Sequence, residues 1–460
     1  MPVTIALKQV KLPDFGMSEE LVQIPAEEFE KRISAAIQQM KEEKIDVLLV
    51  FADREHSANL AYLTNLDPRF EEGLLLLDKN GKRKMLLGNE NIGYTGIVPI
   101  PMEYELYQEF SFMGQDRSRS RSLEELFATF GIGKGMTVGC CYYKYFSADK
   151  KFLDLPAYMV DVLRKLTGDA TTVINASGIF MDNEKGLRHR NCLEELVCFE
   201  WASTRTSESM KKMIRQIRVG VREYELSANY ISDGLPLSCH PMVSSGEKAR
   251  MGLSSPSHKK VALKDPFTSA FGVWGALTAR AGMVAENGEQ LNKNVAAFYE
   301  KFWKNYFHCV VIWYETIGIG VSADDVVKRV EAIKDNSIFD FALNPGHTLH
   351  LDEWVNSPFT NDSKVKLYSG MALQADIIPV SKGEFVCANM EDGVVLADEQ
   401  LRNEWSKRFP ESWKRIEARR DFMKNKIGIK LKPEVLPLSN IPAYFSPYLL
   451  SADKVAVITG

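Results

Sequence analysis

The 460-residue sequence has no long hydrophobic run. A transmembrane helix needs a run of about 18 or more apolar residues, so we expect no membrane span. The start of the chain also lacks a basic segment followed by an apolar one, and we expect no signal peptide. The net charge of −4 provides no excess of basic residues for binding nucleic acid.

Paired cysteine motifs are missing as well. Seven cysteines are an odd number, and they show neither a CxxC motif nor the spacing of a zinc ribbon. Most of them lie in apolar runs, which predicts buried reduced thiols and a cytoplasmic location. They are Cys140, Cys141, Cys192, Cys198, Cys239, Cys309 and Cys387. The sequence also has no glycine-rich phosphate loop, no internal repeat and no acidic tail.

The first part of the chain predicts a mixed α/β domain. Apolar residues recur at helical spacing over residues 26–44, and a buried strand follows at 46–51. The dipeptide Asn80-Gly81 between two apolar runs predicts a β-hairpin. Ser122 precedes a short helical pattern and is expected to cap it.

The polar stretch 181–191 predicts a linker, after which the pattern changes. We expect an antiparallel sheet backed by helices, an α+β arrangement. Its expected helices are 193–219, 293–314 and 322–334, and its expected strands are 266–274, 275–284, 370–380 and 384–398, the last two paired across a turn at 381–383. The chain thus predicts two domains, 1–185 and 190–460, with a C-terminal extension from about residue 400.

The segment NPGHTLHLDEW, residues 344–354, places two histidines beside two acidic residues. His347 and His350 are three positions apart, so both could face one side of a helix and bind a metal ion. The segment lacks the HExxH spacing of zinc peptidases, however. By itself it does not define a metal site.

Seven short segments, taken in order, resemble the pita-bread family that includes methionine aminopeptidase, aminopeptidase P, prolidase and creatinase. The resemblance covers roughly residues 25–400, and it lies in the order of the motifs rather than in any one of them. The segments are SANLAYLTNL (57–66), RVGVREYEL (218–226), SSGEKARMGLSSPSHKK (244–260), LKDPFTSAFG (263–272), PGHTLHLDEW (345–354), GMALQAD (370–376) and MEDGVVL (390–396). The resemblance implies a creatinase/prolidase-type N-terminal domain and a C-terminal pita-bread domain.

The resemblance implies two divalent ions held by Asp, Asp, His, Glu and Glu. His347, Asp376 and Glu391 occupy three of these positions, with Asp in place of the first Glu. Both aspartate positions hold alanine, Ala270 and Ala281. A shifted alignment offers Ser269, Leu277 or Thr278, and no carboxylate lies between 266 and 285. Without a bridging carboxylate the two ions repel each other, so we expect no dinuclear centre.

The substrate positions implied by the resemblance have changed too. Asn389 stands where peptidases that cut before proline carry an arginine, and Trp354 stands in place of a second pocket histidine. His258 corresponds to the first pocket histidine. In a creatinase-like reaction without metal, His258 would act as the general base, and Glu391 would bind substrate.

These residues predict a relative of Xaa-Pro aminopeptidase and prolidase that has become a pseudo-peptidase or binds a small or peptide-like ligand. We expect a homodimer, by resemblance and because such dimers are common. Two alternatives stay open. One is a hydrolase that uses a single zinc or manganese ion on His347, Asp376 and Glu391, and the other is a metal-free creatinase-like hydrolase. Any remaining catalysis would involve His258, His347 and Glu391.

Overall fold

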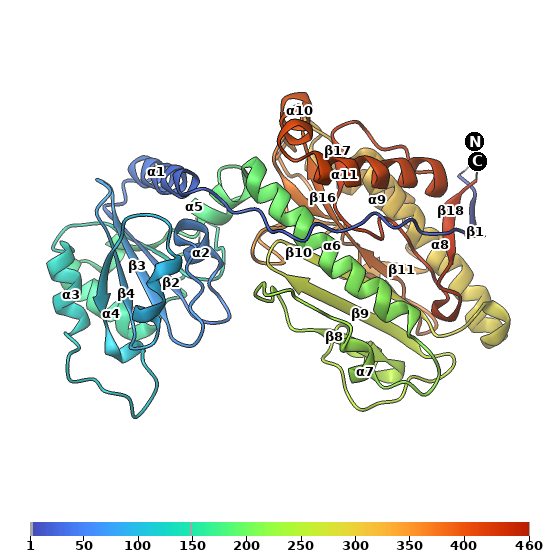
Figure 1. Cartoon of the computed structure of the whole chain (residues 1–460), viewed down its shortest axis with the longest axis horizontal. Coiled ribbons are helices and arrows are strands. Elements are labelled where there is room, and N and C mark those ends of the chain that lie inside the picture. Colours follow the sequence, from blue (N-terminus) through green and yellow to red (C-terminus); the bar gives the residue numbers. More distant parts are fainter. Residues whose placement is uncertain (1–2, 148–149, 460) are drawn as a thin grey trace. The chain divides into compact units, whose positions relative to one another are not determined.

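A computed structural model describes residues 3–147 and 150–459. The chain divides into two compact units (Figure 1). One comprises residues 24–190, and the other comprises residues 191–460 together with the N-terminal segment 1–23. The predicted first domain, 1–185, included the first 23 residues. In the structure these residues belong to the larger unit instead. None of the helices in the described ranges is long and apolar enough to cross a membrane.

The smaller unit is built on a six-stranded sheet with the order β5-β4-β3-β2-β6-β7. Strand β2 pairs antiparallel with β3 and parallel with β6, so the sheet is mixed, and with its helices this unit is the predicted α/β domain. The strands are β2 (Val47–Ala52), β3 (Gly73–Asp78), β4 (Arg83–Leu87), β5 (Glu103–Leu106), β6 (Val138–Cys141) and β7 (Val173–Asn175). The helices are α1 (Ala26–Glu42), α2 (Ala58–Thr64), α3 (Leu123–Phe130), α4 (Ala157–Thr167) and α5 (Gly178–Met181).

Three local predictions for this unit are confirmed. Helix α1 buries Phe29, Ile33 and Met40 on one face, which is the face that the spacing predicted. Strands β3 and β4 form the predicted hairpin, with Gly81 in its turn at a φ of 98°. Ser122 caps α3 by accepting a hydrogen bond from the backbone N–H of Glu125, in a capping box.

The larger unit contains two four-stranded antiparallel sheets, β15-β10-β9-β8 and β12-β13-β16-β17, and two two-stranded pairs, β11-β14 and β1-β18. The first sheet consists of β8 (Met242–Ser245), β9 (Pro266–Val273), β10 (Ala276–Met283) and β15 (Asn389–Glu391). The second consists of β12 (His347–Thr348), β13 (Ala372–Gln374), β16 (Gly393–Leu396) and β17 (Val435–Pro437). The pairs consist of β1 (Ile5–Gln9), β18 (Lys454–Ile458), β11 (Phe339–Phe341) and β14 (Pro379–Ser381).

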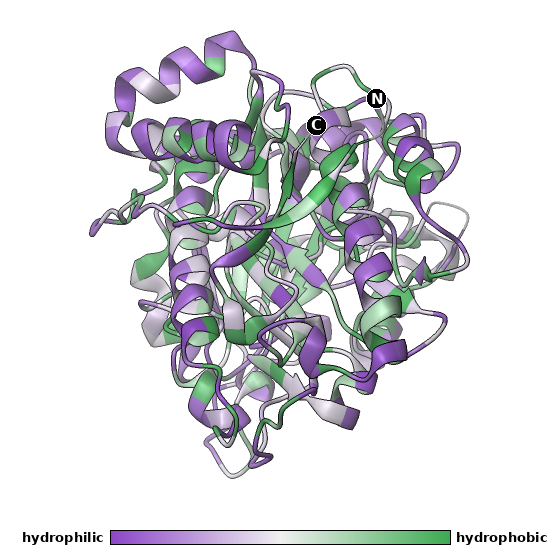
Figure 2. Cartoon of the chain, turned by 90° about the vertical axis from the view of Figure 1, so that its right-hand side faces the viewer, coloured by the Kyte–Doolittle hydropathy of each residue, from purple (hydrophilic) through white to green (hydrophobic). Residues whose placement is uncertain are grey.

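Helices cover these sheets, so the larger unit has the predicted α+β arrangement (Figure 1). Figure 2 shows hydrophobic residues gathered on the strands and hydrophilic residues along the outer sides of the helices. Helix α8 buries several large aromatic side chains, among them Tyr299, Trp303 and Tyr306. The helices are α6 (Leu193–Arg215), α7 (Glu223–Ser227), α8 (Lys293–Thr316), α9 (Ala323–Ile333), α10 (Glu399–Arg408) and α11 (Pro410–Phe422).

Two predictions need correction, one in each unit. Strands 370–380 and 384–398 do pair antiparallel as predicted, through β13 and β16, but residues 381–383 are not a tight turn between them, because β14 at the end of the first strand pairs with β11. The stretch 181–191 is not a plain linker, because Leu187, Arg188 and His189 are buried in a turn of 3₁₀ helix. In both cases long-range packing overrides what the local sequence suggests.

The N-terminal segment joins the larger unit through a strand pair and a core contact. Strand β1 pairs antiparallel with β18 in the register Ile5 to Ile458. Phe15 packs edge-to-face on Phe422, with ring centroids 5.9 Å apart, and belongs to the main core of the unit. These contacts join residues that are more than four hundred positions apart in the sequence, which local periodicity cannot indicate.

Candidate functional site

The first sheet of the larger unit carries Glu391 on its edge strand, β15. Glu391 lies opposite Ala279 of β10, and Ala279 lies opposite Ala270 of β9. Residues directly opposite each other in antiparallel strands extend their side chains to the same face. Glu391 therefore shares its face with two methyl groups.

The next row along this face holds Asn389, Ala281 and Thr268, again in direct opposition across the three strands. Both expected aspartate positions, Ala270 and Ala281, thus lie on the face that carries Glu391. The surroundings of the first row are apolar, since they consist of Ala270, Leu277 and Ala279 with Cys239, Met242 and Leu253 packed against them.

His347 reaches this region from the second sheet, where β12 pairs it with Gln374 of β13. Its Nδ1 atom lies 3.3 Å from the carbonyl oxygen of Thr348. The ring of Trp354 stacks on the imidazole, with centroids 4.2 Å apart and an interplanar angle of 21°. The stack holds the imidazole ring in place, and its Nε2 atom is turned toward carboxylates.

Three carboxylates approach His347 Nε2. The distance from Nε2 is 3.4 Å to Glu391 Oε1, 3.8 Å to Glu353 Oε1 and 3.9 Å to Asp376 Oδ2. His347, Asp376 and Glu391 are almost fully buried, and the side chain of Glu353 is 29% exposed. The structure therefore brings together the three predicted ligand positions and adds Glu353, which the sequence analysis did not select.

Several polar atoms of this cluster lack hydrogen-bond partners in the described residues. Within residues 3–147 and 150–459, His347 Nε2, Asp376 Oδ1 and Glu391 Oε1 are buried and make no hydrogen bond. A buried polar atom without a partner costs free energy, so such atoms usually mark a bound group or a functional strain. Two of these atoms, His347 Nε2 and Glu391 Oε1, lie 3.4 Å apart.

The electrostatics of the cluster disfavour ionised carboxylates. Burial, followed by the charge of Glu391, raises the pKa of Asp376 well above its usual value, and His347 opposes this only in part. Burial and the charges of Glu353 and Asp392 likewise raise the pKa of Glu391 well above its usual value. Without added positive charge, the cluster thus favours protonated carboxyl groups.

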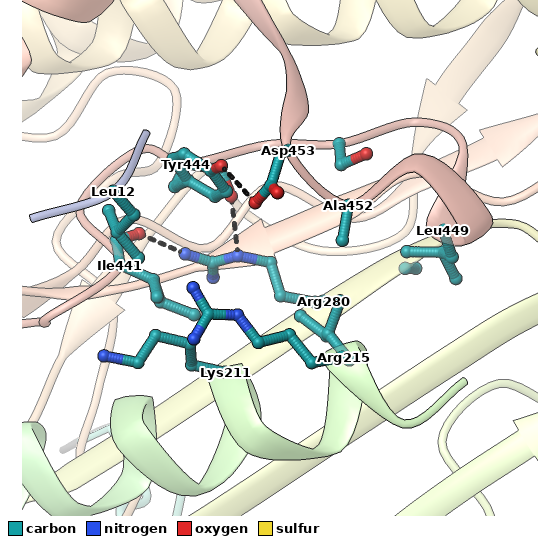
Figure 3. Close-up of a pocket in the computed structure, with 12 residues that line it drawn as sticks. Leu12, Lys211, Arg215, Arg280, Ile441, Tyr444, Leu449, Ala452 and Asp453 are labelled. Atoms are coloured by element: carbon teal, nitrogen blue, oxygen red, sulfur yellow. Dashed lines mark hydrogen bonds between the residues drawn. The ribbon is translucent and has the colours of Figure 1, made fainter. Parts of the chain in front are cut away.

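Arg280 offsets the negative charge of the cluster only in part. Its Nη2 atom binds both carboxylate oxygens of Asp392, at 3.0 and 2.9 Å, in a buried ion pair. The same guanidinium donates to the backbone carbonyls of Ile441 and Tyr444 (Figure 3). The cavity beside it has a volume of only ≈ 30 Å³, about the size of one water molecule. Arg280 is therefore a structural residue here.

A larger cavity of ≈ 470 Å³ lies over the row of Thr268, Ala281 and Asn389. This volume is in the range of sites for small ligands. Asn389 is buried, and its Oδ1 atom accepts a hydrogen bond from Tyr306 at 3.3 Å. The lining also includes Arg250, whose guanidinium lies 3.9 Å from the ring centroid of Phe385.

The structure does not bring His258 to the cluster. His258 is exposed, its ring lies 5.0 Å from that of Tyr224, and its carbonyl accepts a hydrogen bond from Arg222. Trp354 lies against His347 rather than apart from it. The other histidine of the segment, His350, faces Glu195 with Nε2 3.0 Å from Oε1, in a buried pair outside the cluster.

Glu353 is the member that sequence reasoning missed. It lies six residues beyond His347, in an acidic pair with Asp352 that resembles ordinary loop composition. Burial, and next the charge of Asp352, raise the pKa of Glu353, while His347 opposes the shift. Only the closeness of two acidic residues to His347 could have indicated it, and that signal is weak.

Comparison with known proteins identifies the fold that carries this site. Residues 32–92 match the family described as the creatinase/prolidase N-terminal domain. The chain is similar to the prolidase of Pyrococcus horikoshii OT3, with a TM-score of 0.61 and 14% identity over 80% of this chain and 95% of that chain. The chain has the prolidase and aminopeptidase P fold. No curated protein matches the sequence.

Two further solved structures share the fold. The Xaa-Pro dipeptidase of Bacillus anthracis is 16% identical, with a TM-score of 0.60 over 81% of this chain and 96% of that chain. A variant of Escherichia coli aminopeptidase P is 15% identical, with a TM-score of 0.57 over 82% of this chain and 93% of that chain. The predicted resemblance and the two-domain fold class are confirmed.

The residues around His347 fit one metal ion better than two. The buried ligand atoms His347 Nε2 and Glu391 Oε1, both without hydrogen-bond partners in the described residues, suit a divalent cation, and Glu353 lies close enough to add a third ligand atom. A bound cation would supply the positive charge that the cluster lacks. A second cation next to the first would have to lie against Ala270 and Ala279, which offer no ligand atoms on their side chains.

Proposed function

We propose that this protein binds a small peptide-like ligand and does not hydrolyse peptides by a two-metal mechanism. The observation that carries the proposal is the row formed by Ala270, Ala279 and Glu391. In a two-metal hydrolase the two ions stabilise the attacking and the leaving atoms together. Methyl groups beside Glu391 leave no ligand for the second of these ions.

The apolar packing around the row supports the same conclusion. Ala270 and Ala279 contact Leu277 and are covered by Cys239, Met242 and Leu253. Burial, and next the charges of Glu353 and Glu391, raise the pKa of Cys239 to about 12, so its thiol stays protonated at neutral pH. A neutral thiol does not supply the negative charge of a missing carboxylate.

The cavity over Asn389 supports ligand binding. Its volume of ≈ 470 Å³ suits a small ligand such as a dipeptide or tripeptide, and it lies one row from Glu391. Asn389 and Thr268 contribute polar atoms to its lining, and Phe385 contributes an apolar surface. The fold is shared with a prolidase and an Xaa-Pro dipeptidase, which makes Xaa-Pro peptides the first ligands to test.

The alternatives receive different degrees of support. A creatinase-like reaction needs His258 near Glu391, and the exposed position of His258 argues against it. A single divalent ion is compatible with the proposal, because one ion can bind beside Glu391 without a ligand from β9 or β10. A one-metal hydrolase therefore remains the second candidate, and the hydrolysis assay below tests it.

The test measures hydrolysis and binding of the same peptides. The purified protein is incubated with Ala-Pro and Ala-Pro-Ala, with and without added Mn²⁺ or Zn²⁺, and free alanine is quantified. We expect no release of alanine over buffer, and we expect binding of the peptides by calorimetry. Release at an ordinary enzymatic rate, on the order of 1 s⁻¹ or more, that disappears in His347→Ala would contradict the proposal.

Two variants test the location of the ligand. Thr268→Trp fills the cavity from its half-buried wall, and we expect it to weaken peptide binding at least tenfold. Asn361→Leu, an exposed position on a loop outside the cavity, serves as the control and should bind as the native protein does. Unchanged binding by a folded Thr268→Trp variant would show that the cavity is not the ligand site.

A homodimer and a cytoplasmic location belong to the same proposal. The homodimer is expected by resemblance and from the frequency of symmetric dimers among soluble proteins. The cytoplasmic location is expected from the odd number of cysteines, which form no disulfide in the described residues. Sedimentation equilibrium would measure the first, and fractionation of cells that produce the protein would measure the second.

A further inference from the structure

We propose that the protein holds one divalent metal ion on His347, Glu353 and Glu391, with Glu353 as a ligand that the expected set of five does not contain. The ion would lie between the imidazole Nε2 atom and one oxygen of each glutamate. This inference concerns metal binding only, and it does not depend on whether the cavity takes a peptide.

The geometry of the donors is close to that of a bound ion. One ligand atom from each of His347, Glu353 and Glu391 lies within 4.8 Å of the other two. In a tetrahedral zinc site with bonds of about 2.1 Å, ligand atoms lie about 3.4 Å apart. The distance from His347 Nε2 to Glu391 Oε1 is 3.4 Å, and the distance to Glu353 Oε1 is 3.8 Å. Small shifts of Glu353 would complete the site.

Hydrogen bonding prepares His347 for such a bond. Its Nδ1 atom lies 3.3 Å from the carbonyl oxygen of Thr348, so a proton on Nδ1 can be donated there. The lone pair of Nε2 then points toward the carboxylates, and Nε2 has no hydrogen-bond partner in the described residues. Metal-binding histidines commonly use their second nitrogen in this way, which sets the tautomer and the ring orientation.

Charge balance also favours an ion. Three acidic side chains surround His347, and the guanidinium of Arg280, which lies next to them, binds Asp392. Like charges a few ångströms apart repel strongly when they are shielded from water. A divalent cation would neutralise two of the carboxylates. The competing arrangement is a metal-free cluster of protonated carboxyl groups, and the experiment below separates the two.

Glu353 is a better third ligand than Asp376. The mutually close set contains Glu353, whereas Asp376 has a shorter side chain, and its Oδ2 atom lies 3.9 Å from His347 Nε2. Glu353 belongs to a loop, and its partly exposed side chain can move toward an ion. Asp376 would then act as a positioning residue beside the ion site. Three protein ligands leave a coordination position open.

The ion class follows from the ligands. One imidazole nitrogen and two carboxylate oxygens suit borderline divalent ions such as Zn²⁺ and Mn²⁺. The stoichiometry should be one, because the neighbouring strand positions are Ala270 and Ala279. A pair of ions about 4 Å apart would need further oxygen ligands at these positions.

The experiment uses the full-length protein after treatment with a chelator and gel filtration. Zn²⁺ and Mn²⁺ are titrated separately by calorimetry, and the metal content is measured by elemental analysis after removal of unbound ions. We expect 1 equivalent of bound ion per chain and a higher melting temperature. A content of two equivalents, or no binding to a folded protein, would overturn the inference.

Variants assign the ligands. Glu353→Gln should weaken binding of Zn²⁺ at least tenfold, as should His347→Ala. Asp352→Asn changes the adjacent residue of the same loop, which is outside the set of three, and should alter affinity less than threefold. Circular dichroism verifies that each variant is folded.

Other outcomes are informative in the same assay. If Glu353→Gln binds as tightly as the native protein while Asp376→Asn loses binding, the third ligand is Asp376, and the inference is wrong. If one ion binds and the loaded protein also hydrolyses Ala-Pro, the inference stands, and the peptide-binding proposal fails. If one ion binds and no peptide does, the metal inference again stands and the peptide-binding proposal fails.

Discussion

At the scale of single residues, the protein contains two contrasting kinds of buried carboxylate. Glu200 is buried and accepts hydrogen bonds from Arg415 at 2.9 and 2.6 Å, and Arg419 lies 2.7 Å away. Glu391 is equally buried, but one of its oxygens has no hydrogen-bond partner in the described residues. The first carboxylate is satisfied and structural, whereas the second is the kind of group that a ligand or ion would satisfy.

The ionisation of Glu200 predicts a loss of stability in acid. Burial by itself would raise its pKa, but Arg419 and Arg415 outweigh burial, and the pKa is lowered. A lowered folded-state pKa contributes stability above the unfolded-state value of about 4.3, and this stability is lost as pH falls through the folded-state value. The free energy of unfolding of the native protein should therefore fall below about pH 4.3.

The variant Glu200→Gln tests this prediction. At pH 7 it leaves two buried arginines without their anion, and we expect it to lower the free energy of unfolding by about 3–5 kcal/mol. Urea unfolding at pH 7, 5, 4 and 3 should show that the difference between variant and native protein shrinks in acid. Glu28→Gln, in the exposed pair with Lys31, is the control and should stay within about 0.5 kcal/mol at every pH. A constant difference for Glu200→Gln would contradict the assignment.

At the scale of elements, the hairpin of β9 and β10 decides the chemistry of the site, because it carries Ala270 and Ala279. Its turn contains Gly275 at a φ of 86°. A Cβ atom at this position would lie 2.5 Å from a ring carbon of Phe199 in α6. The tight turn and the close helix together fix the register of β9 and β10. This register places Ala270 and Ala279 in one row with Glu391.

Gly275→Ala should therefore destabilise the larger unit. We expect a loss of about 2–4 kcal/mol, from the left-handed backbone and from the clash with Phe199. Gly220 has a φ of 90° but no atom near its Cβ position, so Gly220→Ala should lose only about 1–2 kcal/mol. Urea unfolding followed by tryptophan fluorescence measures both. Equal losses in the two variants would mean that contact with Phe199 does not constrain the hairpin.

At the scale of the whole molecule, the N-terminal segment stabilises the unit that contains the site. Strand β1 pairs with β18, and Phe15 packs on Phe422 in the core of that unit. All seven tryptophans lie between residues 201 and 413, so their fluorescence reports only on this unit. The units can therefore be followed separately.

Phe15→Ala should lower the free energy of unfolding of the larger unit by about 3 kcal/mol, since it removes a buried aromatic ring. Tryptophan fluorescence in urea measures this loss, while hydrogen exchange of β2 and β3 follows the unit 24–190. We expect exchange in β2 and β3 to stay unchanged. Met17→Ala, at an exposed position of the same segment, should change stability by less than about 0.5 kcal/mol. Faster exchange in β2 and β3 of Phe15→Ala would contradict the division into units.

The sequence by itself determined the features that depend on near neighbours or on residue identity alone. The apolar spacing in α1, the turn at Gly81 and the cap at Ser122 are local, and each was predicted. The absence of a carboxylate between residues 266 and 285 needs no coordinates, because no folding can supply a side chain that the sequence lacks. The order of short motifs was sufficient for the fold.

The tertiary structure alone decided which polar residues meet. Glu353 approaches His347 because the loop after β12 folds back, whereas His258 lies exposed beside Tyr224. The pairing of β14 with β11, and of β1 with β18, depends on register and packing between distant segments. Such contacts arise from the summed burial of many side chains, and no local pattern encodes them. The ligand set proposed for the ion is a product of that packing.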